Sequence, residues 1–140
     1  MSEVVGVLKG GLDTQWPALA PWIGRALAEG GGEYRIDDIR EMASDGRVQV
    51  WAFLENGEHQ GVAVTQLVRY PRQLVAQIFL GAAKDGFSEQ WPPWLEGIEA
   101  WAKVAHGATG MEIIGRPGWA KRLQGFGYRQ TQVVMRKELR

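Results

Sequence analysis

The sequence contains no cysteine, which excludes disulfide bonds and thiolate metal sites and agrees with a reducing compartment. Its formal net charge is +0, so no global field would steer the protein to nucleic acid or to an anionic membrane. The two histidines, His59 and His106, stand too far apart for a metal-ligand spacing. The chain start lacks a signal-peptide pattern and no apolar run reaches membrane-spanning length, so we expect synthesis in the cytoplasm.

Apolar residues, tryptophan and glycine are what the sequence has in quantity. Hydrophobic residues make up 45% of the 140 residues, which predicts one globular domain over residues 1–140. We expect most of the 7 tryptophans to lie in the core. Trp16, Trp22 and Trp91 come at the starts of predicted elements, so these three are candidates for exposed rings that face another protein.

The first third of the chain predicts one strand and two helices. Val4–Leu8 is a short apolar run before a pair of glycines and indicates a strand. Apolar residues recur at helical spacing between Trp16 and Glu29, and two prolines leave the start of this helix open. A second helix is predicted from about Asp38 to Ser44, with Asp37 as its N-cap.

The middle of the chain predicts three antiparallel strands. Arg47–Leu54 and Gln60–Tyr70 are apolar runs joined through Asn56-Gly57, the dipeptide most typical of a tight hairpin. Pro71 ends the second run and turns the chain into a third, Gln73–Leu80. We therefore expect an antiparallel meander.

A parallel crossover follows the meander. The loop Gly81–Glu89 leads into an amphipathic helix, Trp91–Ala105, and then into a short strand, Thr109–Ile114. A strand, helix and strand in this order predict a right-handed crossover that sets Thr109–Ile114 parallel to Gln73–Leu80.

Two more elements complete the predicted fold. A helix is expected over roughly Trp119–Gln124 and a closing strand over Tyr128–Leu139. The fold class is therefore α/β (α+β), with a mixed, mostly antiparallel sheet, one parallel βαβ crossover and four helices.

This order of elements resembles the GNAT superfamily of N-acyltransferases over nearly the whole chain. The local sequence of the second half is similar to that of GNAT-like proteins encoded by tailed phages and prophages. The residues that carry this similarity are Leu95, Glu99-Ala100-Trp101-Ala102-Lys103, Gly115-Arg116-Pro117-Gly118-Trp119, Leu123 and Gly127-Tyr128. The resemblance implies a GNAT-like fold in which two parallel strands splay apart and acyl-coenzyme A lies in the gap.

Carried over by position, the resemblance places the cofactor at the end of one predicted strand and in the loop after it. The candidate binding residues are Phe79, Leu80, Gly81, Lys84 and Gly86. In the family, backbone N–H groups of this loop and of the following helix hold the pyrophosphate, and Lys84 would supply one positive charge here.

The same loop departs from the family's cofactor signature. Asp85 and Glu89 would repel a diphosphate, and Pro92-Pro93 remove two N–H groups from the start of the helix. We therefore expect an ordinary turn and helix cap rather than a working pyrophosphate site, and weak or absent binding of acetyl-coenzyme A.

Catalytic side chains are equally hard to place. Many members of the family use a tyrosine near the last helix as general acid, and aligning Gly127-Tyr128 with the end of that pattern places Leu123 at the position of the acid. Leucine has no proton to give. The ring of Tyr128 would then pack in the core. Gln77 cannot act as a base, so Glu112 is the only acidic residue inside either central strand, and we expect it to face an edge or solvent.

The remaining polar groups have simpler interpretations. His106 lies at a helix C-terminus, where an imidazolium favours the helix dipole, and we expect capping rather than catalysis. Arg116, Lys121 and Arg122 form a basic spot that we expect to be a solvated helix face.

Two functions from different classes remain open. The first is a non-catalytic structural, assembly or binding module of a phage particle, with no cofactor, made in the host cytoplasm and incorporated in a virion. Its partners would be other proteins, either phage structural proteins or a second copy of itself, with no metal, no membrane and no clear nucleic-acid signal. The alternative is an acetyl-CoA-dependent N-acetyltransferase that acts on an amine; this sequence favours the first.

Overall fold

The computed structural model describes residues 2–30, 32–84, 91–115 and 117–140. The elements, in chain order, are β1 (Ser2–Val7), the 3-10 helix η1 (Lys9–Gly11), α1 (Leu12–Ala28), α2 (Ile36–Ser44), β2 (Gln49–Glu55), β3 (Glu58–Tyr70), β4 (Gln73–Ala83), α3 (Trp91–His106), β5 (Gly110–Ile113) and α4 (Pro117–Gln124).

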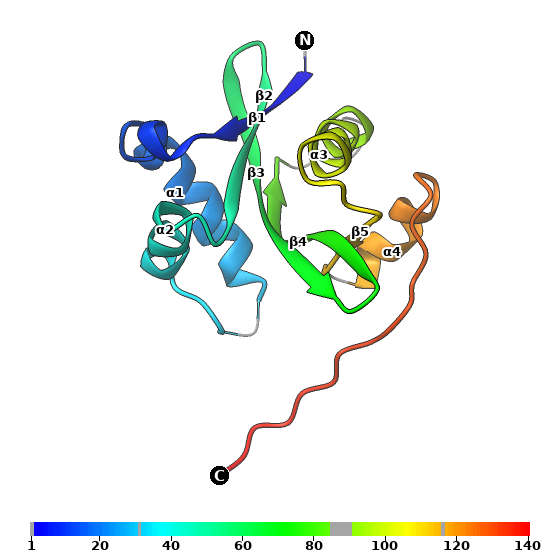
Figure 1. Cartoon of the computed structure of the whole chain (residues 1–140). Helices are drawn as coiled ribbons and strands as arrows, with labels where there is room; N and C mark the ends of the chain where they lie inside the picture. Colours follow the sequence, from blue (N-terminus) through cyan, green and yellow to red (C-terminus); the bar gives the residue numbers. More distant parts are fainter. Residues whose placement is uncertain (1, 31, 85–90, 116) are drawn as a thin grey trace.

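The five strands form one sheet in the order β1-β2-β3-β4-β5. All neighbours pair antiparallel except β4 and β5, which pair parallel. Figure 1 shows α1 and α2 on one face of this sheet and α3 and α4 on the other. The predicted meander and the predicted parallel crossover are both confirmed.

The β2–β3 hairpin turns where the sequence predicts it. Glu55 pairs with Glu58, so Asn56 and Gly57 are the two central residues of the turn. Their φ angles are +50° and +82°, the left-handed pair that a type I′ turn requires. Asparagine and glycine adopt these angles at little cost, which fixes the register of the meander.

Helix α1 begins earlier than predicted and contains both prolines. It starts at Leu12, and Pro17 and Pro21 lie inside it. Each proline removes one backbone hydrogen bond of the helix, but the helix buries a continuous apolar face that stabilises it. The buried residues of this face are Leu12, Trp16, Leu19, Ile23 and Ala26.

The prediction that Trp16 is exposed is therefore wrong, because Trp16 is 7% exposed on the buried face of α1. Trp22 is half-buried and packs against the same core. The side chain of Trp91 lies outside the part of the chain that the structure describes.

Helix α2 also begins before its predicted start. The N-cap position is Arg35, and the Arg35 backbone N–H donates to Asp38 Oδ2 at 2.8 Å. The predicted N-cap, Asp37, lies inside the first turn instead. A carboxylate there still favours the positive end of the helix dipole.

The sheet separates two apolar clusters. The first, between the sheet and the helices α1 and α2, contains among others Leu19, Ile23, Ile39, Val50, Val62 and Val64. The second, between the sheet and the helices α3 and α4, contains Trp51, Phe53, Ala63, Ile78, Trp94, Leu95, Ile98 and Leu123. Both faces of β2, β3 and β4 are thus covered, so these strands carry apolar residues at consecutive positions.

The predicted closing strand, Tyr128–Leu139, is wrong. Residues 128–140 form no strand, helix or turn, and Figure 1 shows them leaving α4 as an extended segment. A strand needs a neighbour for its backbone hydrogen bonds, and this segment does not lie along the sheet of its own chain.

Replacing Gly61 with alanine should destabilise the fold, because β3 and β4 approach closely at this residue. A Cβ on Gly61 would lie 2.4 Å from the Ala82 carbonyl oxygen and 2.9 Å from Ala83 Cα, both backbone atoms. We expect Gly61→Ala to lower the free energy of unfolding by about 1–3 kcal/mol. Urea denaturation measures this change.

Gly10→Ala is the matched control, since a Cβ there meets nothing within 4 Å. Equal stability of the two variants would contradict the close packing of β3 on β4.

Candidate functional site

The two parallel strands, β4 and β5, separate halfway along β4. Val75 to Ile78 of β4 pair with Gly110 to Ile113 of β5, and the Ile114 N–H donates to the Ile78 carbonyl oxygen at 2.9 Å. Beyond this point β4 runs on to Ala83 and, among the residues that the structure describes, pairs only with β3. One edge of the last five residues of β4 therefore faces a gap, which we call the split.

An irregularity in β4 stands where the split begins. Val64 of β3 lies opposite Leu80, and Thr65 lies opposite Ile78, so Phe79 has no opposite residue on β3. Such a bulge leaves its extra residue outside the ladder and increases the local twist of the strand. The bulge thus turns the end of β4 away from β5 and frees backbone polar groups at the split.

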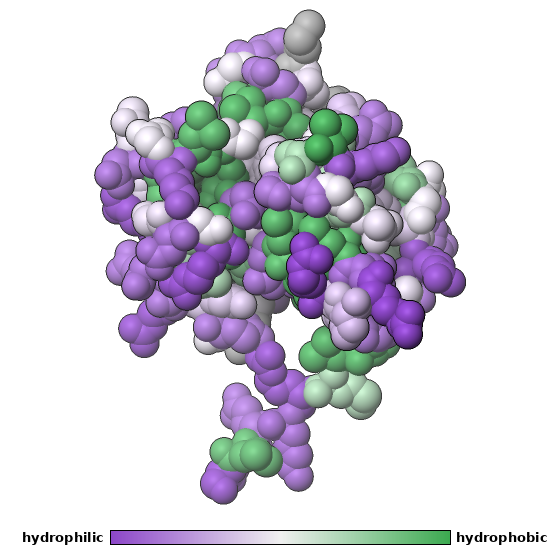
Figure 2. Space-filling model, viewed as in Figure 1, coloured by the Kyte–Doolittle hydropathy of each residue, from purple (hydrophilic) through white to green (hydrophobic). Residues whose placement is uncertain are grey.

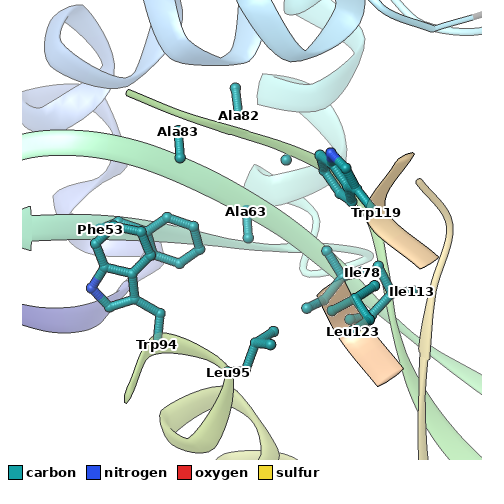
Figure 3. A pocket seen from close by; sticks show the side chains of 11 residues that line it. Phe53, Ala63, Ile78, Ala82, Ala83, Trp94, Leu95, Ile113, Trp119 and Leu123 are labelled. Atoms are coloured by element: carbon teal, nitrogen blue, oxygen red, sulfur yellow. The ribbon is translucent and has the colours of Figure 1, made fainter. Parts of the chain in front are cut away.

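An apolar pocket lies on the side of the split that faces α3 and α4 (Figure 3). Its cavity volume is about 50 Å³, and it is partly open to solvent. The described residues that line it are all apolar or glycine: Phe53, Ala63, Ile78, Gly81, Ala82, Ala83, Trp94, Leu95, Ile113, Trp119 and Leu123. Apolar clefts with few polar groups are typical binding sites for small molecules and cofactors.

Two aromatic rings make one wall of this pocket rigid. Trp94 of α3 stacks on Phe53 of β2, with ring centroids 4.3 Å apart and an interplanar angle of 7°. Trp94 is 1% exposed, so neither ring can move without opening the core. The wall is therefore formed before any ligand binds.

The ring of Trp119 lies in the split itself. A Cβ on Gly81 of β4 would be 3.4 Å from Trp119 Cη2, and a Cβ on Gly115 would be 2.3 Å from Trp119 Cε3. Only glycine at position 115 allows the indole to lie so close to the backbone that follows β5. Trp119 thus narrows the passage between the two strands.

A polar network occupies the opposite face of the same strands. Met111 and Ile113 of β5 pack toward α3, so Glu112 between them points to the other face. Its carboxylate accepts a hydrogen bond from Tyr70 Oη at 3.0 Å and one from Gln77 Nε2 at 3.0 Å. Gln66 Nε2 in turn donates to Gln77 Oε1 at 2.7 Å.

This network orients one carboxylate next to the split. Donation to the Glu112 carboxylate raises the pKa of the Tyr70 hydroxyl, which therefore stays protonated as a donor. Glu112 is two residues before Ile114, where β4 and β5 separate. A positioned carboxylate at such a place can bind an ammonium group or accept a proton from an amine.

Tyr128 has a structural role, as expected from the sequence. Its ring packs against the second apolar cluster, and its hydroxyl donates to Glu99 Oε2 at 2.6 Å. Burial, followed by the hydrogen bond to Glu99, raises the pKa of Tyr128. The hydroxyl therefore stays protonated, and its hydrogen bond to Glu99 connects the chain after α4 to α3.

The predicted cofactor residues fall in or next to the split. Phe79, Leu80 and Gly81 all lie on β4 beyond its last pairing with β5. Lys84 follows β4 directly; its side chain is exposed and its N–H donates to the Gln60 carbonyl oxygen at 2.8 Å. Gly86 lies outside the described residues.

Other predicted residues are distributed more widely. Leu123 lines the pocket, and Lys121 and Arg122 are exposed near the end of α4. Arg116 lies outside the described residues. The ring of His106 packs edge-on against Trp101, 4.9 Å between centroids.

Sequence reasoning missed the link from Glu112 to Tyr70 and Gln77. The only signal was the placing of Gln66, Gln77 and Glu112 inside otherwise apolar strands. A polar residue at a position that should be buried indicates a hydrogen-bonded network or a site.

Over the residues that the structure describes, no cluster of three histidine, aspartate or glutamate side chains could hold a metal ion. Within the same residues, no helix combines the length and the apolar character needed to cross a bilayer.

The sequence matches no protein-family profile and no curated protein. Solved structures do match. The aminoglycoside acetyltransferase meta-AAC0020 from an uncultured soil metagenomic sample, in complex with sisomicin, gives a TM-score of 0.71 at 9% identity over 99% of this chain and 97% of that chain. The aminoglycoside N-acetyltransferase AAC(6')-Iy in complex with CoA gives 0.73 at 14% identity, over 100% and 95%.

A ribosomal-protein-alanine N-acetyltransferase from Brucella melitensis biovar Abortus 2308 gives a TM-score of 0.66 at 10% identity, over 100% of this chain and 99% of that chain. At these identities the likeness shows the fold alone. The fold is the GNAT-like α/β fold, as predicted. The narrower resemblance to phage-encoded proteins is not tested by these structures and stays a prediction.

The contact of Trp119 with Gly115 can be tested by adding a side chain at position 115. Gly115→Ala would drive its Cβ into the indole, so we expect Trp119 to be displaced and the free energy of unfolding to fall by about 1–3 kcal/mol. Gly118→Ala, where a Cβ meets nothing within 4 Å, should be neutral or slightly stabilising. Urea titrations of both variants compare them; equal losses would show that the indole does not lie on Gly115.

Stability should fall steeply in alkali because of Tyr128. Its pKa is raised in the folded protein, so the folded state keeps a proton that the unfolded state releases near pH 10. The contribution is present in full below about pH 10 and is lost as the pH rises above it. We expect Tyr128→Phe to flatten this fall in denaturation curves recorded from neutral pH to pH 11; an unchanged slope would contradict the assignment.

Proposed function

We propose that this protein binds an acyl-coenzyme A in the split and transfers the acyl group to an amine. The observation that carries the proposal is the end of β4–β5 pairing at Ile78 and Ile114, with an apolar pocket in the gap that follows. The solved structures with the same fold include acetyltransferases, one of them in complex with CoA, and so favour this activity over a non-catalytic role.

The residues present fit the pantetheine arm of such a cofactor. This arm is a narrow amide chain, and the free edge of β4 from Phe79 to Ala83 offers backbone N–H and C=O groups to it, much as a sheet edge takes up an added strand. The apolar lining of the pocket would exclude water from the thioester. Lys84 would supply positive charge for the phosphates.

The start of α3 fits the phosphates less well. Pro92 and Pro93 occupy its first turn and have no backbone N–H to donate. Affinity should therefore come from the split and its pocket rather than from the helix N-terminus.

Glu112 is the residue that we assign to the acceptor side. The pocket lies on the α3 face of the sheet and the carboxylate lies on the other, so acyl donor and amine would enter from opposite faces. The carboxylate would hold the ammonium group and take up its proton, while Tyr70 and Gln77 keep the carboxylate in place.

A second candidate is a protein-binding module that keeps the fold without the chemistry. The indole of Trp119 favours it, because the ring already lies in the split against Gly81 and Gly115. A role in a phage particle, and a virion location, would belong to this candidate.

Calorimetric titration with acetyl-coenzyme A tests the proposed cofactor site. We expect saturable binding to the unaltered protein and at least about tenfold weaker binding to Gly81→Val, whose side chain would enter the split beside Trp119. Gly118→Ala is the control and should bind normally. Absence of binding to the unaltered protein, or equal binding to Gly81→Val, would contradict the proposal and favour the module.

The acceptor assignment has its own test, in the release of coenzyme A thiol with a panel of primary amines. The protein has no cysteine, so the assay has no background from the chain. Glu112→Gln should retain acetyl-coenzyme A affinity and lower turnover by about 10²–10⁴. Tyr70→Phe, which keeps the ring and removes one hydrogen bond, should lower turnover less; full turnover in Glu112→Gln would rule out this carboxylate.

A further inference from the structure

The pocket beside the split contains empty volume that larger side chains would have filled. Its cavity volume is about 50 Å³, several times the roughly 10–15 Å³ that one water molecule needs. The room arises because the strands along the pocket carry only alanine or glycine at Ala63 of β3 and at Gly81, Ala82 and Ala83 of β4. Voids larger than a water molecule are few in a folded domain, so a void in this place indicates an occupant.

Aromatic rings close both ends of the pocket. Figure 3 shows Trp119 on one side and the stacked rings of Phe53 and Trp94 on the other, with Ala63 between them. Trp119 is half-buried and lies in the split, whereas Phe53 belongs to β2, two strands away from β4. The pocket therefore leads from the split into the molecule and ends at a fixed aromatic wall.

The lining suits a hydrocarbon chain better than any other part of an acyl-coenzyme A. Every described residue of the lining is apolar or glycine, so an amide or a phosphate placed there would lose hydrogen bonds to water without replacing them. The backbone groups that could replace them lie along the free edge of β4 instead. A small apolar cavity of this kind stays dry and binds apolar groups.

The outer surface offers such a chain much less. Figure 2 shows apolar residues on this face of the molecule only in patches, with hydrophilic residues around them. A tail that lay on this surface would stay in contact with water, whereas a tail in the pocket would leave water. The pocket is therefore the place where the length of an acyl chain can affect its binding.

We propose that this pocket takes the hydrocarbon tail of the acyl group and selects straight chains of about four carbons, with butyryl preferred to acetyl and to octanoyl. The inference rests on the proposed function, which sets the thioester at the free edge of β4. At roughly 10–15 Å³ for each group of the size of a water molecule, the cavity has room for about three to five chain atoms. The tail would cross Gly81 and Ala63 and end against the ring of Phe53.

The wall of Phe53 and Trp94 explains the upper limit of chain length. The ring centroids are 4.3 Å apart and Trp94 is 1% exposed, so a longer chain could advance only by displacing a ring from the core. Opening a close-packed core costs more free energy than each further methylene group gains by leaving water. The lower limit has the opposite cause, since an acetyl group leaves most of the cavity empty.

Calorimetric titration with coenzyme A and with its acetyl, butyryl and octanoyl thioesters tests the proposal. Affinity should rise about fourfold for each added methylene group, or roughly 15-fold from acetyl to butyryl. It should then fall at least about tenfold from butyryl to octanoyl, because the longer tail meets the aromatic wall. Equal affinities along the series would overturn the proposal, and so would a steady rise to octanoyl.

The substitution Ala63→Val fills the pocket. It adds two methyl groups at a buried position on β3, where a β-branched residue suits the strand. The preference for butyryl-coenzyme A over coenzyme A should fall at least about tenfold, and urea denaturation should show no loss of stability, since the added groups occupy empty volume. Ala100→Val, at an exposed position on α3, is the matched control and should keep the preference.

Two results with Ala63→Val would overturn the proposal. A retained preference for butyryl-coenzyme A would place the tail elsewhere. A clear loss of stability would mean that position 63 has no empty volume beside it.

A gain of affinity cannot come from damage to the fold, so it tests the aromatic wall directly. Phe53→Leu replaces the ring by a smaller apolar side chain, and octanoyl-coenzyme A should then bind at least about tenfold tighter than to the unaltered protein. Phe126→Leu is the matched control, because Phe126 is 38% exposed and does not line the pocket. Octanoyl-coenzyme A binding to Phe53→Leu no tighter than to Phe126→Leu would overturn the proposal.

Failure of this proposal and failure of the proposed function give different results. Protein that shows the chain-length series but transfers no acyl group to any amine would contradict the transfer reaction and support the tail site. Protein that binds coenzyme A and all three thioesters equally would overturn the tail site and leave the cofactor site in the split standing. Failure to bind any of the four compounds would overturn both.

Discussion

The hydrogen bond from the Ile114 N–H to the Ile78 carbonyl is the last that joins β4 to β5, and the site depends on where it falls. Up to this bond the two strands form a regular parallel ladder. Beyond it, β4 continues for five residues with β3 as its one neighbour in the described part of the chain. The bulge at Phe79 adds twist at the same place, so the two strands diverge and leave backbone polar groups facing a gap.

The packing on either side of the sheet gives the two faces of this gap different chemistry. On the side of α3 and α4, stacked Trp94 and Phe53 and the indole of Trp119 make an apolar pocket. On the other side, Tyr70 and Gln77 hold the carboxylate of Glu112. The apolar pocket and the oriented carboxylate lie on opposite faces of the sheet, and under the proposed function each would take one reactant. Such an arrangement suits transfer between two molecules that approach from opposite faces.

The same topology places β5 at the outer edge of the sheet. Because β5 is the last strand and its neighbour β4 diverges from it, β5 is bonded over only four residue pairs. A short strand with one partner is weakly held, and a second neighbour would restrain it.

The sequence by itself determined the elements that depend on neighbouring residues. The Asn56-Gly57 turn, the antiparallel meander and the parallel crossover could all be predicted, because turn chemistry and apolar periodicity act over a few residues. The start of α1, the burial of Trp16 and the cap of α2 could not, since burial of a helix face outweighed two prolines and local capping preference. For the site, the position of Phe79 and Leu80 near a strand end could be predicted. The prediction that Gly81 begins the loop is wrong, because β4 continues to Ala83. The pairing of Glu112 with Tyr70, 42 residues apart, was decided only by tertiary structure, because strand register brings those two side chains together and no local pattern encodes it.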